Sequence, residues 1–185
     1  MAFKKRKPMI ILLYLILVAS LITNFFQFDS NNELNQTLND TTEKSKDDFM
    51  ERLRDVERIT EENLETDTIH KSELTELNYL FLQLDRESNF LLDLNSKDKV
   101  IKEGEQNNLE IFGVISNYFA RKGAQIDEGG SLSLQNKEAL YQEIKIIQEA
   151  TRNAASVDKN QEEGKFILEL NNTLEESYRS IQNNL

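Results

Sequence analysis

The sequence has no cysteine and no tryptophan, and its 185 residues include only one histidine, one proline and six glycines. The absence of cysteine excludes a disulfide framework, thiolate metal sites and cysteine nucleophiles. The single histidine, His70, excludes any site that needs two imidazoles. Because so few glycines and prolines are available for turns, the composition also disfavours a fold built from many β-hairpins.

The charge of the chain is acidic and unevenly placed. The sequence has 22 Lys and Arg against 33 Asp and Glu, a net charge of -11. Binding to a phosphate backbone depends on basic residues that displace counterions, so this balance argues against a nucleic-acid partner. Four basic residues open the chain, at Lys4, Lys5, Arg6 and Lys7, and the first acidic residue is Asp29.

The segment between these charge blocks, Met9–Phe28, is 20 residues long and uncharged. As a helix it would extend about 30 Å, which matches the hydrocarbon core of a bilayer. Positive charges on its N-terminal flank alone predict a cytoplasmic N-terminus and an extracellular C-terminal domain. The sequence therefore predicts one N-terminal transmembrane helix, a signal-anchor in the lipid bilayer of the cell membrane, whose outer end carries Phe25, Phe26 and Phe28.

A cleaved signal peptide is the alternative interpretation of this segment. Met9–Ala19 would serve as its apolar core, and Val18-Ala19-Ser20 as its cleavage site. However, hydrophobicity resumes from Leu21 onward, and a secreted domain would gain nothing from an apolar N-terminus. The pattern favours an uncleaved anchor.

The rest of the chain has the 3.6-residue spacing of apolar side chains that is typical of amphipathic helices. We divide the protein into a cytoplasmic basic tail (1–8), the anchor (9–28), a polar stalk (29–46) and an extracytoplasmic domain (47–185). Helices are predicted over 47–65, 69–95 and 97–122, after Ser133 and over 159–184, with one clear loop over 123–133. The predicted fold class is all-α: one transmembrane helix plus an antiparallel bundle of four or five helices.

The predicted helix over 69–95 is apolar on two faces. One stripe contains five residues: Leu74, Leu77, Phe81, Leu84 and Leu91. Tyr79 and Phe90 fall on the opposite side, about 20° apart, with Leu82 on their flank. Either this is a central bundle helix with neighbours on both sides, or Tyr79, Leu82 and Phe90 form a docking patch for a protein partner.

The predicted helix over 97–122 has two exceptions on its apolar stripe. Gly104 and Asn108 stand at positions where a bulky apolar side chain is expected. These two residues indicate either a close approach of helices or a buried polar contact that fixes the register of helix pairing.

No pattern of catalytic, cofactor-binding or metal-ligating residues is evident. Asp67 and His70 have the spacing of half a dinuclear carboxylate site, but the required second histidine is missing. Ser96 and Lys99 have the spacing of a β-lactamase nucleophile, but its companion motifs are absent. We therefore expect no enzymatic activity, no catalytic residue, no cofactor and no metal site.

These features predict a membrane-anchored, extracytoplasmic helical interaction or scaffold protein of the cell envelope, with an unknown protein partner. One alternative is a ligand-sensing bundle that acts through a membrane partner, since residues 29–185 contain no second apolar span. Another is a secreted helical protein. The sequence leaves open whether the chain forms a homo-oligomer, because an intramolecular core and a dimer seam have the same pattern.

Overall fold

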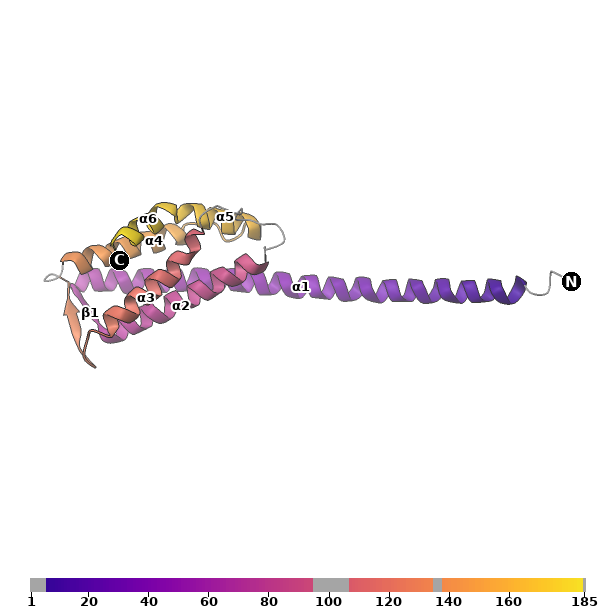
Figure 1. The fold of residues 1–185 in the computed structure, drawn as a ribbon, viewed down its shortest axis with the longest axis horizontal. Coiled ribbons are helices and arrows are strands. Elements are labelled where there is room, and N and C mark those ends of the chain that lie inside the picture. The colour runs from indigo at the N-terminus through magenta and orange to yellow at the C-terminus, as the bar shows by residue number, and fades with distance from the viewer. Residues whose placement is uncertain (1–5, 95–106, 135–137, 185) are drawn as a thin grey trace. The chain divides into compact units, whose positions relative to one another are not determined.

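The computed structural model describes the backbone of residues 6–94, 107–134 and 138–184. Within these ranges, the side chains of residues 6–16, 18, 19, 94, 163, 183 and 184 lie outside the description. By its internal contacts the chain divides into an N-terminal unit, Met1–Glu43, and a bundle unit, Lys44–Leu185. The described residues are mostly helical, with one small antiparallel sheet (Figure 1).

The first helix, α1, runs from Arg6 to Thr66 and contributes to both units. Residues 29–46, the predicted stalk, are helical despite their many weak helix formers. Two threonine hydroxyls in this stretch donate to carbonyl oxygens one turn earlier, Thr37 to Glu33 at 2.9 Å and Thr41 to Thr37 at 2.7 Å. This local bonding lets the threonines remain within a helix.

The bundle unit adds eight described elements to the end of α1. They are β1 (Thr68–His70), α2 (Lys71–Leu94), the 3-10 turn η1 (Asn108–Glu110), α3 (Ile111–Gly123), β2 (Ser131–Ser133), α4 (Glu138–Ala155), α5 (Glu163–Thr173) and α6 (Glu175–Asn184). In Figure 1 the end of α1 lies between α2 on one side and α4, α5 and α6 on the other, and α3 crosses α1 in this view. Ion pairs support both contacts, Arg52 with Glu87 of α2 at 3.1 Å and Glu57 with Arg152 of α4 at 2.8 Å.

The prediction of a purely helical fold is wrong at the far end of α1. There β1 and β2 form a two-stranded antiparallel sheet with Ile69 opposite Leu132. The structure therefore contradicts the predicted helix start at residue 69 and the loop assignment of 131–133. Asp67 has a φ of 53°, so its backbone is left-handed and α1 ends just before it. Ile69, in the centre of β1, is fully buried. Burial of Ile69 and pairing with a distant strand outweigh the local helical pattern.

The boundaries of three later helices also differ from the prediction. The predicted helix over 159–184 is two helices, α5 and α6, which meet at Leu174, so the described bundle contains more than five helices. The helix predicted over 97–122 is described from η1 onward, and Ser96 and Gly104 lie outside the described residues. The helix predicted to start after Ser133, with Ser133 as its N-cap, is α4, which begins at Glu138, and Ser133 belongs to β2 instead.

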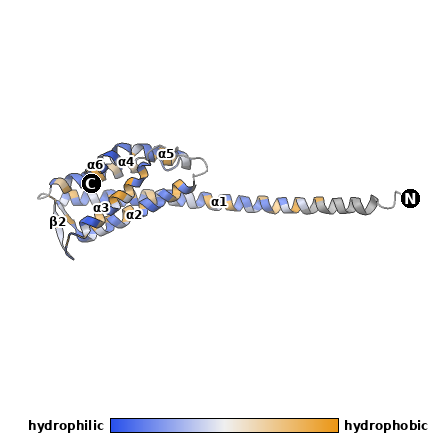
Figure 2. Cartoon of the chain, viewed as in Figure 1, coloured by the Kyte–Doolittle hydropathy of each residue, from blue (hydrophilic) through white to orange (hydrophobic). Residues whose placement is uncertain are grey.

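The core of the bundle unit contains an aromatic cluster among many aliphatic side chains. Phe81 of α2 stacks on Phe119 and Phe112 of α3, with ring centroids 5.8 and 6.4 Å apart. Phe49 of α1 meets the edge of Phe112 at 5.5 Å and of Phe166 in α5 at 6.3 Å. The five residues of the predicted inner stripe of α2 are all buried, which confirms that stripe. Figure 2 shows polar and apolar residues alternating along these helices.

Asn108 makes a buried polar contact, as its position on an apolar stripe indicated. Its backbone N–H donates to Asn171 Oδ1 at 2.7 Å, and its Nδ2 donates to the Asn171 carbonyl oxygen at 2.9 Å. Both residues are buried. The pair fastens η1 to α5 across the apolar core, where each unpaired polar group would be costly.

Asn171→Leu is expected to lower the free energy of unfolding by about 1–3 kcal/mol, because it keeps the side-chain volume but leaves the buried Asn108 N–H without its acceptor. Urea unfolding followed by circular dichroism measures this loss. Asn172→Leu, at the exposed neighbouring position, is the control and is expected to change stability by less than about 0.5 kcal/mol. Equal effects of the two substitutions would contradict the importance of the contact.

Candidate protein-docking surface

The outer face of α2 carries three large apolar side chains that the bundle does not cover. Tyr79 is 58% exposed, Leu82 36% and Phe90 39%. At about 100° per residue, the three fall within an arc of about 80° on one side of the helix. We call this set the α2 patch. The structure brings together all three residues that the sequence pattern had grouped.

The neighbours of α2 explain why this face remains free. On one flank α3 approaches closely, since Ser116 Oγ donates to Asn78 Oδ1 at 2.8 Å. A Cβ atom at Gly113 of α3 would lie 3.0 Å from Asp85 Oδ1, which shows how near the two helices come. On the other flank α1 contacts α2 through Arg52 and Glu87. The α2 patch lies between these two contacts and faces solvent.

The Arg52–Glu87 pair is the most perturbed carboxylate site among the described residues. Arg52 Nη2 lies 3.1 Å from Glu87 Oε1, and the Glu87 side chain is only 16% exposed. Glu87 Oε2 is buried and has no hydrogen-bond partner in the described structure. Burial raises the pKa of Glu87 from 4.5 to about 7; Arg52 opposes this shift and Asp48 adds to it. Burial likewise raises the pKa of Asp85.

A second polar cluster joins α3 to α4. Tyr118 Oη donates to Glu143 Oε2 at 2.5 Å, and Lys122 Nζ lies 3.1 Å from the same oxygen and 5.0 Å from the Tyr118 ring centroid. Burial and the hydrogen bond to Glu143 raise the pKa of Tyr118 far above its ordinary value. Tyr118 therefore stays protonated and cannot serve as a base near neutral pH. We interpret this cluster as a brace between helices.

His70 lies beside a surface cavity of about 420 Å³ next to the β ribbon. Lys71, Glu128, Gly129 and Gly130 also line this cavity. The His70 backbone N–H donates to Glu73 Oε2 at 2.6 Å, which caps the start of α2. In the ranges that the structure describes, no group of three His, Asp or Glu residues is placed to hold a metal ion.

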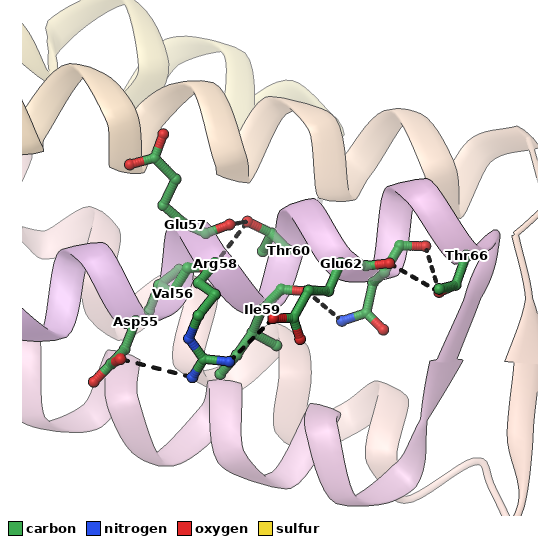
Figure 3. Close-up of polar contacts among 9 residues, drawn as sticks. Asp55, Val56, Glu57, Arg58, Ile59, Thr60, Glu62 and Thr66 are labelled. Carbon is green, nitrogen blue, oxygen red and sulfur yellow. Dashed lines mark hydrogen bonds and ion pairs between the residues drawn. The ribbon is translucent and has the colours of Figure 1, made fainter.

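Several polar side chains at the end of α1 bond within their own helix (Figure 3). The buried Thr60 hydroxyl donates to the carbonyl oxygens of Val56 and Glu57 at 2.8 and 2.9 Å. Arg58 pairs with Asp55 at 3.7 Å and with Glu62 at 3.3 Å. Exposed pairs of this spacing contribute only a few tenths of a kcal/mol, so this region supports the helix without offering a site.

The N-terminal unit contains the residues assigned to the anchor. The side chains of Phe25, Phe26 and Phe28 are exposed on α1. Arg6 and Lys7 are within α1, but their side chains are outside the description, as are Lys4 and Lys5 entirely. Among the described residues, no helix has a stretch long and apolar enough to cross a bilayer. The structure does not describe the side chains of half of the predicted span, residues 9–16, 18 and 19.

Comparisons with protein-family models, with curated proteins and with solved structures found no match.

Two features of the bundle unit were not found by sequence reasoning. Glu87 and Arg52 are ordinary polar residues in their own helices, and only the packing of α1 against α2 buries them together. Lys46, at the end of the predicted stalk, is almost completely buried. Its ammonium group donates to the Gln161 carbonyl oxygen at 3.2 Å and lies 6.0 Å from the Phe166 ring centroid. The one sequence signal for the burial of Lys46 is its inward position in the helical repeat of α1.

Proposed function

We propose that this protein is a membrane-anchored helical interaction protein of the cell envelope, which binds a protein partner through the α2 patch. The observation that carries the proposal is the exposure of Tyr79, Leu82 and Phe90 on one face of a helix whose other face forms the core. Tyrosine and phenylalanine each bury about 150–250 Å² when covered, so they are effective anchors for a partner.

The membrane anchor in this proposal is Met9–Phe28, with no charged residue in 20 positions. This segment belongs to the continuous helix α1, and a helix of 20 residues extends about 30 Å. The basic residues Lys4, Lys5, Arg6 and Lys7 precede it, which favours a cytoplasmic N-terminus and an extracellular bundle. The apolar side chains of Phe25, Phe26 and Phe28 extend the lipid-facing surface to the outer end of this segment.

The surroundings of the α2 patch add polar recognition to the apolar contact. Arg86 lies between Leu82 and Phe90 on the same face and is exposed, and arginine is often an energetic centre of interfaces. Asp93 and Glu76, also exposed, stand at the two ends of the face. A partner with an apolar groove and basic groups at its edges would match this surface.

Tyr79→Asp and Phe90→Asp are each expected to reduce the yield of a specific crosslinked complex about tenfold, because a charge in the patch would be buried without a partner. The measurement is mild crosslinking of the full chain in intact cells, followed by purification. Leu168→Asp is the matched control, since Leu168 is 40% exposed but lies on α5. Circular dichroism checks that all three variants remain folded. Equal recovery of the complex from every variant would refute the role of the patch.

A further inference from the structure

A stripe of uncharged side chains follows one face of α1 through the N-terminal unit. Ser20, Asn24, Gln27, Asn31, Leu34 and Leu38 follow one another at alternating steps of four and three residues. At about 100° per residue they fall within an arc of about 80°, so they form one continuous seam. We call this set the α1 stripe. All six side chains are exposed, and Leu34 and Leu38 are 66% and 47% exposed.

The acidic residues of the same unit lie on the other side of the helix. Asp29, Glu33, Asp40 and Glu43 all fall about 140° or more from the centre of the α1 stripe. Two identical acidic helices would repel each other if these side chains faced one another. The α1 stripe is the face along which two copies can approach without that repulsion.

The only apolar side chains between Asp29 and Glu43 are Leu34 and Leu38. Both belong to the α1 stripe and are separated by one helical turn. Leucines placed in this way on an otherwise polar helix are typical of a coiled-coil seam, where each packs against the facing helix. In a single copy, this apolar surface is left in water.

We propose that two copies of this protein pair in parallel along the α1 stripe. The proposal extends the function proposed above, because it takes Met9–Phe28 as the membrane anchor. Of the four polar side chains in that segment, three belong to the stripe: Ser20, Asn24 and Gln27. An amide in hydrocarbon requires a hydrogen-bond partner, and it can both donate and accept.

A second copy is the occupant that this chemistry fits. A copy inserted by the same segment presents Asn24 and Gln27 at the same depth, so identical amides meet and satisfy each other. A single asparagine in such a seam also selects two parallel helices in register. A different membrane protein would have to carry amides at matching depths, and nothing in this chain would ensure that.

The absence of cysteine makes a direct test of this pairing possible. Leu34→Cys and Leu38→Cys place a single thiol on the α1 stripe, whereas Glu33→Cys and Asp40→Cys place it on the acidic face. Each full-length variant is oxidised in native membranes and analysed on a non-reducing gel. Disulfides require Cβ atoms about 4 Å apart, so stripe positions are expected to give about fivefold or more dimer than their matched controls. Adding Asn24→Leu to Leu34→Cys is expected to reduce dimer formation severalfold.

Alkaline carbonate extraction of the same membranes separates failure of the pairing from failure of the anchor. If the protein stays in the membrane pellet but stripe and acidic-face thiols form dimer equally, the pairing is overturned and the anchor stands. If carbonate releases the protein while stripe thiols still form dimer preferentially, the anchor is overturned and the pairing stands. Disulfides from the stripe thiols to another protein alone would overturn a second copy as the occupant.

Discussion

Phe112→Ala is expected to lower the free energy of unfolding of the bundle unit by about 3–5 kcal/mol. Phe112 is 2% exposed and contacts Phe49 of α1 and Phe81 of α2. Its ring therefore links three helices, and alanine would leave a cavity that they cannot close. Chemical unfolding of the full chain in detergent, followed by circular dichroism, measures the loss.

Phe90→Ala is the control for this substitution, because it removes the same side chain from the α2 patch. Phe90 is partly exposed, so its loss is expected to cost less than about 1 kcal/mol. Both variants replace phenylalanine by alanine, so the difference between their unfolding free energies reports whether each ring lies in the core or at the surface. A cost for Phe90→Ala as large as that for Phe112→Ala would contradict the outward placement of the patch.

The stability of the bundle is expected to fall by about 2 kcal/mol as the pH rises from about 5 to about 8. The pKa of Glu87 is about 7 in the folded protein against an ordinary value of 4.5. Between these values the folded state holds a proton that the unfolded state has released, so rising pH favours unfolding. Burial also raises the pKa of Asp85, which contributes in the same direction.

Glu87→Gln is expected to remove most of this pH dependence and to raise stability at pH 8, since it replaces a buried carboxylate by a neutral amide. Urea unfolding of wild type and variant across this pH range measures both effects. If the ion pair with Arg52 outweighed the cost of burial, the variant would instead be less stable than wild type at pH 8. That result would contradict the raised pKa.

Much of the fold could be predicted from helical periodicity. The inner stripe of α2 is buried as expected, because a regular helix repeats every 3.6 residues and its apolar side chains must share one face. The same arithmetic placed Tyr79, Leu82 and Phe90 on the other face. It could not tell a second buried face from an exposed patch, since both have the same spacing. Only the positions of α1 and α3 along the flanks of α2 decided that question.

The errors occurred where distant segments meet. Residues 68–70 continue a helical pattern, yet they pair with β2 more than 60 residues later, and no local signal specifies that register. The separation of α5 from α6 at Leu174 likewise occurs without proline or glycine. Packing stabilises both the β1–β2 pairing and the break between α5 and α6. Burial of Ile69 and of Leu174 compensates for the helical hydrogen bonds that these interruptions remove.

The sequence by itself determined that the chain is helical, acidic and free of cysteine, because composition and the helical repeat are local properties that need no partner. Tertiary structure alone decided which charged side chains became buried. Glu87 and Lys46 have ordinary neighbours along the chain, and segments remote in sequence bury both of them. The physical reason is that desolvation depends on everything that surrounds a group in space, which the order of residues does not specify.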